Sequence, residues 1–401
     1  MQEGDLRQSR TPAVSCVLLG IGAACLYYYF RRVCKVPRLV CASPLRNFLE
    51  THCPVLKDEY RPTFWCHEGR LQTVFRVLFV SRPHVSYRNE ILPTSDGGQI
   101  SLDWVDNRGS CQFPDGSSRP TIIFLPGLTG SSHQTYMLHL VIQASRDGYR
   151  SVVFNNRGFG GEKLLTPRTF CAANTEDLHR VIGHVRCTLP AAPLLAVGVS
   201  LGGMTLLNYL SATGDASQLC AAISVSTPWN VFVSTESLEK PLNYLLFNQT
   251  LVRGIKRTVE KHRDVIGQVV DVDYVLQSRS IREFDERFTA PLFGFQSCDE
   301  YYRNASPCHK LGGISTPTLC LNASDDPFSP REALPLDAVS SHPSVALLIT
   351  RHGGHIGFLE GLFPNHQRYM DRVFSQFAES VFRHGEELSA VTTRLPGEHP
   401  L

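Results

Sequence analysis

One serine lies in a short glycine-rich stretch that is suited to nucleophilic chemistry. Residues 196–204 read AVGVSLGGM, so Gly198 stands two positions before Ser200 and Gly202 two positions after it. An apolar run precedes the stretch, as in a buried strand, and apolar residues with helical spacing follow it. In a G-x-S-x-G turn between a strand and a helix, the glycines leave room for a strained serine and the turn exposes its hydroxyl above the carboxyl ends of the strands. We therefore predict that Ser200 is a nucleophile.

A serine hydroxyl needs a general base, and that base needs a group to orient it. After a nucleophile at this kind of turn, the acid and then the histidine follow along the chain. The stretch LNASDDPFSP contains Asp325 and Asp326, and the later stretch RHGGHIGF contains two histidines. We predict Asp326 rather than Asp325 as the acid, because the loop begins after Asp326. We predict His355 rather than His352 as the base, because the two glycines before it let the loop bring it over the serine.

Two backbone N–H groups are predicted to bind the oxyanion that forms when a carbonyl carbon is attacked. One belongs to Leu201 at the start of the following helix, where the helix dipole favours negative charge. The second is expected from the loop after a neighbouring strand. There the stretch LPGLTGSS offers Leu128, and Gly127 allows the backbone to approach closely. This chemistry needs no metal ion or cofactor, and we expect none.

The elements that position these residues alternate along the chain. Short apolar runs such as PTIIFLPG, YRSVVFNN, PLLAVGVS and SVALLIT are separated by helical segments, as in a parallel sheet covered on both faces. The stretch SYRNEILPTSDGGQISLDWVD predicts an antiparallel hairpin with a tight turn at its glycines. Residues 228–310 are more helical and more charged, and an insertion of this length is a candidate cap over a site. We predict an α/β fold with a mostly parallel central sheet flanked by helices.

An uncharged segment lies near the N-terminus. Residues 13–30 read AVSCVLLGIGAACLYYYF and would form a helix ~27 Å long, close to the ~30 Å hydrocarbon core of a bilayer. Three tyrosines and several basic residues at its end are typical of a membrane interface, whereas a cleaved signal peptide has a shorter apolar region with charge before it. The predicted organisation is a tail (1–12), a transmembrane anchor (13–30), a juxtamembrane connector (31–85), a catalytic domain (86–385) with a cap insertion at about 228–310, and a disordered tail (386–401).

The orientation of this anchor stays open. Four basic residues between positions 31 and 38 mildly favour a cytoplasmic catalytic domain. Glycosylation sequons begin at Asn248, Asn304 and Asn322, and they would matter only in a lumenal domain.

The overall composition excludes several classes of function. The 401 residues are 42% hydrophobic and 19% charged, which suits a globular protein with a large core. A net charge of +2 gives no basic surface of the strength that nucleic acids attract, so we expect no nucleic-acid partner. The 13 cysteines are scattered without a C-x-x-C pair, which argues against structural zinc and for buried, reduced thiols.

Several longer stretches extend these motifs. They resemble the α/β-hydrolase subgroup that contains mammalian α/β-hydrolase domain-containing proteins 1, 2 and 3. The stretches are YRPTFWCHEGRLQT, FNNRGFGGEKLLTPRTF, FDERFTAPLFGFQSCDEYYRNASP and LNASDDPFSP. The resemblance covers most of residues 50–385. It implies an α/β-hydrolase fold and a serine hydrolase acting on lipid esters, phospholipase-like or acylglycerol-lipase-like, with Ser200, Asp326 and His355 as the triad. It also implies a single-pass signal-anchor in the endoplasmic reticulum or another endomembrane, in a type II orientation that would place the catalytic domain in the lumen.

The expected partners are therefore a lipid ester substrate and the bilayer, whereas the sequence indicates no particular protein partner. One alternative is acyl transfer to an alcohol or amine through the same acyl-enzyme. His366 and Asp371 match the short acyltransferase pattern, although they lie in a predicted helix after the base. A second alternative is a non-catalytic membrane scaffold built on a hydrolase fold, against which the complete triad argues.

Overall fold

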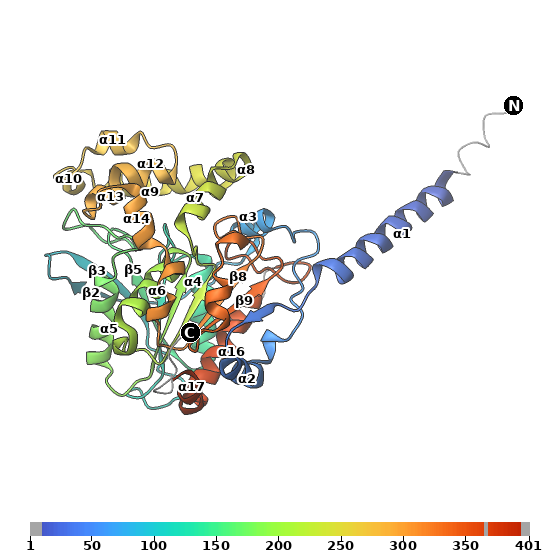
Figure 1. The fold of residues 1–401 in the computed structure, drawn as a ribbon, viewed down its shortest axis with the longest axis horizontal. Helices are drawn as coiled ribbons and strands as arrows, with labels where there is room; N and C mark the ends of the chain where they lie inside the picture. Colours follow the sequence, from blue (N-terminus) through green and yellow to red (C-terminus); the bar gives the residue numbers. More distant parts are fainter. Residues whose placement is uncertain (1–9, 365–367, 394–401) are drawn as a thin grey trace.

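The computed structural model describes residues 10–364 and 368–393, and a single β-sheet forms its centre (Figure 1). In this part of the chain the sheet has nine strands in the order β1-β9-β8-β7-β6-β4-β5-β3-β2. The six strands from β9 to β5 run parallel, and antiparallel strands complete both edges. The strands are β1 (Arg38–Val40), β2 (Arg88–Pro93), β3 (Gln99–Val105), β4 (Thr121–Leu125), β5 (Arg150–Asn155), β6 (Leu194–Val199), β7 (Ala221–Val225), β8 (Thr318–Ala323) and β9 (Val345–Thr350).

The burial of the strands explains their composition. Every residue of the six parallel strands is buried, because helices cover both faces, and each strand therefore reads as an apolar run. Strands β2 and β3 pair from Arg88 with Trp104 to Pro93 with Gln99, which confirms the predicted hairpin. Its turn includes Gly97 at a φ of 78°, a conformation that glycine adopts without strain.

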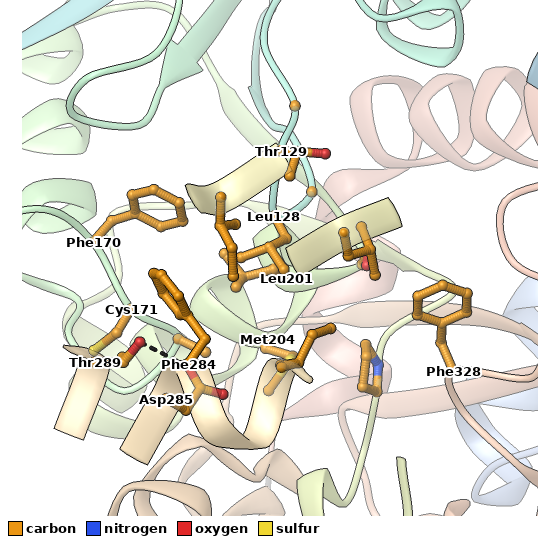
Figure 2. Close-up of a pocket in the computed structure, with 18 of the residues that line it drawn as sticks. Leu128, Thr129, Phe170, Cys171, Leu201, Met204, Phe284, Asp285, Thr289 and Phe328 are labelled. Atoms are coloured by element: carbon orange, nitrogen blue, oxygen red, sulfur yellow. Dashed lines mark hydrogen bonds between the residues drawn. The ribbon is translucent and has the colours of Figure 1, made fainter. Parts of the chain in front are cut away.

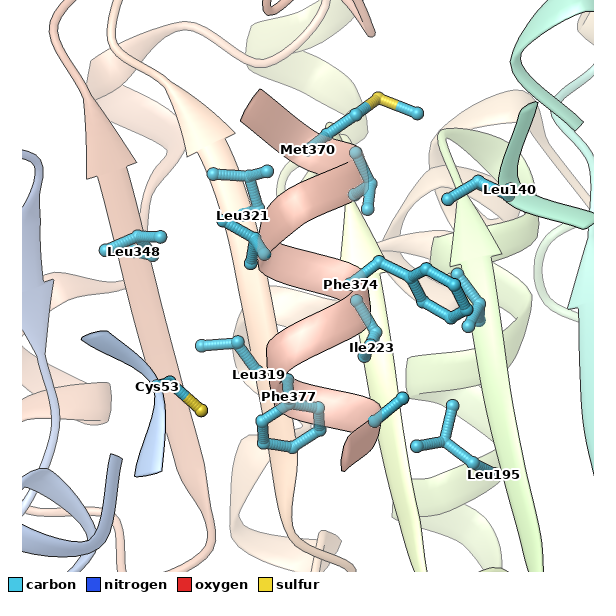
Figure 3. Close-up of a cluster of buried hydrophobic side chains, with 14 of the residues drawn as sticks. Cys53, Leu140, Leu195, Ile223, Leu319, Leu321, Leu348, Met370, Phe374 and Phe377 are labelled. Carbon is cyan, nitrogen blue, oxygen red and sulfur yellow. The ribbon is translucent and has the colours of Figure 1, made fainter. Parts of the chain in front are cut away.

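Two layers of helices cover the sheet. Helices α2, α4, α16 and α17 pack on one face, and α5, α6 and α15 pack on the other. Figure 3 shows α16 laying Phe374 and Phe377 over strand residues such as Leu195, Ile223 and Leu319. This arrangement confirms the predicted fold class. The bounds are α2 (Ser43–His52), α4 (Thr135–Arg146), α5 (Glu176–Thr188), α6 (Leu201–Thr213), α15 (Leu336–Ser340), α16 (Tyr369–Arg383) and α17 (Gly385–Thr392), with 3-10 turns η2 (Pro54–Leu56), η3 (Gly214–Ala216) and η8 (Arg331–Ala333).

Between β7 and β8 the chain leaves the sheet and forms a separate group of helices, drawn in yellow and orange at the top of Figure 1. They occupy residues 231–305, inside the predicted insertion. Their mutual packing includes an apolar cluster around Ile255, Phe284 and Phe288. The elements are α7 (Val231–Glu239), α8 (Pro241–Asn243), η4 (Tyr244–Asn248), α9 (Gln249–Lys261), α10 (Arg263–Ile266), α11 (Val272–Leu276), α12 (Ile281–Phe284), η5 (Asp285–Thr289), α13 (Ala290–Leu292) and α14 (Cys298–Ala305), followed by turns η6 (Pro307–His309) and η7 (Leu311–Gly313).

The segment 31–85, expected as a connector, is an integral part of the folded domain. Its strand β1 pairs with β9 and extends the sheet, and α2 buries Leu45, Phe48 and Leu49 in the main core. These apolar residues recur at the spacing of one helix face, so burying them on the sheet removes that face from water. Helix α3 (Gly69–Phe79) then packs against the loops at the carboxyl ends of β8 and β9, through Gly69 beside Asp325 and Thr73 beside His355. The domain therefore begins well before residue 86.

The C-terminal segment also departs from the prediction, because a disordered tail was expected from residue 386. Helix α17 continues the fold to Thr392, and Leu388 is fully buried in the main core beside α2. The imidazole of His52 on α2 lies 3.0 Å from the Glu387 carboxylate on α17, so it also joins the two helices. Apolar packing of Leu388 and Val391, together with hydrogen bonds at Glu387 and Thr392, docks this short helix. Residues 394–401 lie outside the described part of the chain.

The N-terminal helix lies apart from the domain. Helix α1 (Arg10–Tyr28) continues into a π-helical turn, η1 (Tyr29–Val33), and extends away from the sheet (Figure 1). Residues Ser15–Val33 are long and apolar enough to cross a membrane, and few of their side chains are buried. The transmembrane role of the predicted segment 13–30 stays a prediction, and residues 1–9 of the predicted tail lie outside the described part.

Candidate active site

Ser200 occupies a sharp turn between β6 and α6. Its backbone has a φ of 56° and a ψ of −119°, a strained combination for a residue with a side chain. A Cβ on Gly202 would lie 2.3 Å from the carbonyl oxygen of Leu125, and one on Gly198 would lie 2.5 Å from the carbonyl oxygen of Gly202. Only glycine fits at both positions. The sequence pattern therefore marks a place where the backbone crowds around the serine.

His355 and Asp326 lie in line with this hydroxyl. The Nε2 of His355 is 2.9 Å from the Oγ of Ser200, and its Nδ1 is 3.0 Å from the Oδ2 of Asp326. All three residues are at least nine-tenths buried. The backbone N–H of Phe328 donates to Asp326, and the Phe328 ring stacks on the imidazole at 4.0 Å between centroids. The imidazole is thus held in one orientation by a carboxylate and by an aromatic ring.

The loop that carries His355 donates hydrogen bonds to two other parts of the fold. The backbone N–H of His355 donates to the Thr73 hydroxyl on α3 at 2.8 Å. The next N–H, of Ile356, donates to the Ser226 hydroxyl after β7. Gly354 has a φ of 55° in this turn, a backbone conformation that glycine adopts without strain, as predicted. Thr73 lies in the segment that was expected to be a connector, and sequence reasoning did not identify it.

Asp325 and His352, the alternatives that were not favoured, form a second aspartate–histidine pair beside Asp326 and His355. His352 Nδ1 lies 3.0 Å from the Asp325 carboxylate, which also accepts the N–H of Gly354 at 2.9 Å. Burial raises the pKa of Asp325 above its usual value, and the hydrogen bond from His352 opposes that shift. This pair anchors the histidine loop but does not reach Ser200. The structure therefore brings Asp326 and His355 to the serine, and their catalytic roles stay a prediction.

The predicted oxyanion donors flank the serine. Leu128 and Leu201 both line the cavity that contains Ser200, and a Cβ on Gly127 would lie 3.3 Å from the serine Cβ. The Gly127 N–H donates to the Tyr136 hydroxyl at 2.9 Å, which fixes the loop that carries Leu128. The hydrogen bonds of the described residues include none from the amide of Leu128 or Leu201. Both amides are therefore free to bind an oxyanion, which is the predicted role.

A largely apolar cavity of about 220 Å³ opens on the serine and extends beneath the helices between β7 and β8. Figure 2 shows Phe328 on one side of this pocket and Phe170, Phe284 and Asp285 on the other, with Met204 between them. An apolar channel of this kind suits an alkyl chain attached to the reacting carbonyl.

Two ionisable residues of this cavity were missed by sequence reasoning. Asp285 accepts hydrogen bonds from Thr289 at 2.7 Å and Tyr302 at 3.2 Å, and burial raises its pKa to about 7. Asp285 lies in the π-helical turn η5, inside a stretch that was noted for its resemblance and as part of the candidate cap. Arg76 of α3 also lines the cavity, and its guanidinium lies over the ring of Tyr136, whose hydroxyl accepts the N–H of Gly127. No signal in the sequence separates Arg76 from the other arginines.

Comparison with known proteins agrees with this architecture. Residues 120–362 match the family described as alpha/beta hydrolase fold. Phospholipase ABHD3 of Homo sapiens is 52% identical and covers 93% of this chain and 91% of its own length. Monoacylglycerol lipase of Saccharomyces cerevisiae is 31% identical and covers 78% of this chain and 80% of its own length. Monoacylglycerol lipase ABHD2 of Danio rerio is 29% identical, with 90% of each chain covered. Since the family match spans more than half of the chain and the human relative aligns with nearly all of it, this chain belongs to the α/β-hydrolase fold family.

Proposed function

We propose that this protein is a membrane-anchored serine hydrolase that cleaves carboxyl esters of lipids. The observation that carries the proposal is the hydrogen-bonded series of Ser200, His355 and Asp326 at the wall of an apolar cavity. The series supplies a nucleophile, a base and an orienting carboxylate, and the cavity supplies space for an acyl chain. The names of the relatives, a phospholipase and two monoacylglycerol lipases, support the same class of substrate.

In the proposed mechanism, Ser200 attacks the ester carbonyl carbon while the Nε2 of His355 accepts the hydroxyl proton. Asp326 keeps the imidazole in the required tautomer and stabilises its protonated form. The N–H groups of Leu128 and Leu201 donate to the oxyanion, and the loss of one such donor typically costs ~10² to 10³ in rate. His355 then protonates the departing alcohol, and water releases the acyl group by the same steps.

The surface beside the N-terminal helix supports membrane attachment. The Trp65 Nε1 donates to the carbonyl oxygen of Leu362 at 2.8 Å, and its ring lies 5.6 Å from that of Phe79. Phe64 meets Tyr29 at the end of the apolar helix, so the surface is continuous with the proposed anchor. We name this the α3 surface; its apolar side chains, with exposed fractions from 38% to 72%, are Phe64, Trp65, Val77, Leu78, Phe79, Leu362 and Phe363.

Apolar side chains this exposed are typical of a membrane or protein contact. Because α1 leads directly to them, we propose that the α3 surface rests in the bilayer interface and brings the cavity close to lipid. We further propose that α7 to α14 act as a cap over the serine, since their residues form much of the cavity wall.

Two of the three sequons lie in the core. Asn248 and Asn322 are fully buried, and each makes hydrogen bonds through its side-chain amide. A glycan does not fit at either position in the folded protein. Among the three sequons, Asn304 alone therefore supports a lumenal domain.

Acyl transfer gains no support from the short sequence pattern. Asp371 is buried and accepts hydrogen bonds from the backbone and guanidinium of Arg368 at the start of α16. This carboxylate caps a helix. His366 lies outside the described residues.

Labelling of the membrane-expressed protein with a fluorophosphonate, beside a Ser200→Ala variant, tests the proposal. We expect labelling of the wild-type protein and none of the variant, and loss of ester hydrolysis in His355→Ala. Absence of labelling in a folded wild-type protein would favour the scaffold alternative. Analysis of products with an added alcohol separates hydrolysis from acyl transfer.

A further inference from the structure

We propose that Arg76 binds the phosphate of a phospholipid substrate while the acyl chain occupies the apolar cavity. This inference rests on the proposed function and specifies its substrate class. Arg76 lies in α3, outside the segments that supply the proposed triad and oxyanion donors. It lines the same cavity as Ser200.

The position of Arg76 is set by contacts with both sides of the proposed catalytic centre. One turn earlier on α3, the Thr73 hydroxyl accepts the N–H of His355. On the other side, the Arg76 guanidinium carbon lies 5.6 Å from the centre of the Tyr136 ring, whose hydroxyl accepts the N–H of Gly127. Arg76 is therefore held between the histidine loop and the loop that carries the predicted oxyanion donor. A group joined to the alcohol side of the ester would pass through this region.

Apart from the ring of Tyr136, the charge of Arg76 has no partner among the described residues. Its Nε is buried without a hydrogen bond, and no carboxylate of the described residues forms an ion pair with it. The buried arginines Arg157 and Arg368 differ, because each pairs with an aspartate at 3.0 Å or less. Burial lowers the pKa of Arg76 to about 10, so the group remains charged at neutral pH.

A partly buried guanidinium without an anion is costly to the folded protein, and an anionic ligand would offset that cost. The carboxylate of Asp326 contributes a favourable field at Arg76, but it is bound to His355 and to backbone N–H groups. The planar guanidinium offers two parallel donors to two oxygens of a phosphate diester. Phosphate is the anion that a phospholipid carries near its ester bonds, whereas a monoacylglycerol carries none.

The lining of the cavity favours one orientation of such a substrate. Its far side, around Phe170 and Phe284, is largely apolar, and the carboxyl group of Asp285 there gives a phosphate no positive charge to bind. Two arginines line the cavity among the described residues. Arg157 is paired with two aspartates, whereas Arg76 is paired with no carboxylate. An alkyl chain in the channel and a phosphate at Arg76 would place the ester between them.

The test compares two substrates that differ only in the phosphate-containing group. Lysophosphatidylcholine and monoacylglycerol with the same acyl chain are presented to the full-length protein in the same neutral detergent micelles. The variants are Arg76→Gln, which removes the charge, and Arg76→Lys, which keeps charge but loses the planar fork. Arg82→Gln is the matched control, because Arg82 is exposed, lies outside the cavity and, among the described residues, bonds the His133 carbonyl alone.

We expect Arg76→Gln to lower the ratio of kcat/KM for lysophosphatidylcholine to kcat/KM for monoacylglycerol by about 10- to 100-fold, the usual effect of a lost charge-assisted hydrogen bond. Arg76→Lys should lower the ratio less, and Arg82→Gln should not change it. An equal loss on both substrates would show that Arg76 supports the fold or the oxyanion, and it would overturn the proposal. An unchanged ratio would overturn it as well.

Two further measurements keep the outcomes distinct. Fluorophosphonate labelling of the wild-type protein tests the proposed function by itself, and labelling with thermal unfolding of each variant shows whether it has folded. If Arg76→Gln does not fold, the ratio for Arg76→Lys decides. Inorganic phosphate is also tested as an inhibitor of monoacylglycerol hydrolysis by the wild-type protein. If phosphate inhibits, and the ratio of kcat/KM values is the same in the Arg76 variants as in the wild-type protein, then Arg76 binds a free anion and not the substrate phosphate. That result would contradict the proposal.

Discussion

Replacing Thr73 by valine should slow the enzyme although Thr73 lies 127 positions before the proposed nucleophile in the sequence. The Thr73 Oγ1 accepts the backbone N–H of His355 at 2.8 Å and donates to the carbonyl oxygen of Gly69 at 2.7 Å. Valine has nearly the same shape and makes neither bond. The histidine loop would keep its other anchors, at Gly354 and Ile356, but would lose the one on the histidine itself.

The size of the effect follows from the burial of this N–H. Thr73 and His355 are both buried, so water does not replace the lost acceptor. A buried donor left without a partner costs about 1–3 kcal/mol. If that cost falls on the arrangement in which His355 faces Ser200, then kcat falls by about 5- to 150-fold, since 1.36 kcal/mol corresponds to tenfold. KM should change little, because Thr73 does not line the cavity.

The assay is steady-state hydrolysis of a short-chain soluble ester, with kcat and KM measured separately across pH. Thr73→Ser keeps the hydroxyl and should restore most of kcat. Thr213→Val is the matched control, because the Thr213 hydroxyl makes the same kind of bond, to the Tyr209 carbonyl one turn earlier in α6, away from the site. It should leave kcat unchanged.

Three results would refute this reasoning. A kcat of Thr73→Val within twofold of the wild-type value would show that the bond does not position His355. A loss in Thr73→Ser as large as in Thr73→Val would assign the effect to packing. A similar loss in Thr213→Val would assign it to general destabilisation of the helices.

Further predictions follow from other contacts. Gly202→Ala should abolish fluorophosphonate labelling and lower the melting temperature, because the new Cβ would lie 2.3 Å from the Leu125 carbonyl oxygen; a stable, labelled variant would contradict the strained turn. The pKa of Asp285 is raised to about 7 by burial, so the folded protein holds a proton that the unfolded chain releases near pH 4. Stability should therefore fall as pH rises from about 4 to 7, and Asp285→Asn should reduce this dependence in thermal unfolding, whereas an unchanged slope would assign it to other groups. Phe79→Asp combined with Leu362→Asp should slow hydrolysis of lipid in vesicles while leaving hydrolysis of a soluble ester intact, as measured side by side; equal loss in both assays would remove the α3 surface from membrane binding.

Much of the architecture could be read from local patterns. Parallel strands buried on both faces require apolar runs, so the strands at Thr121–Leu125 and Leu194–Val199 are visible in the sequence. The turn at Ser200 requires glycine at both flanking positions for steric reasons, and that requirement also marks the sequence. The chain order of serine, aspartate and histidine then follows from the topology of the fold.

Other features depend on contacts between distant segments. The sequence alone did not show that residues 38–40 pair with β9, or that α17 docks on α2, because a short strand and a single buried leucine carry too weak a local signal. The sequence also provided only a preference for Asp326 over Asp325 as the acid of the triad. Adjacent aspartates differ in which histidine each one reaches, and only the folded chain shows that.

The sequence by itself therefore determined the class of fold and the type of chemistry, because backbone geometry at strands and at the serine turn restricts residue type locally. The tertiary structure alone decided which side chains meet. It placed Thr73 against the histidine loop and left Arg76 without an anion beside the serine. Both residues lie in a helix whose packing is set by residues far away in the sequence, so their roles follow from three-dimensional neighbours that no local pattern records.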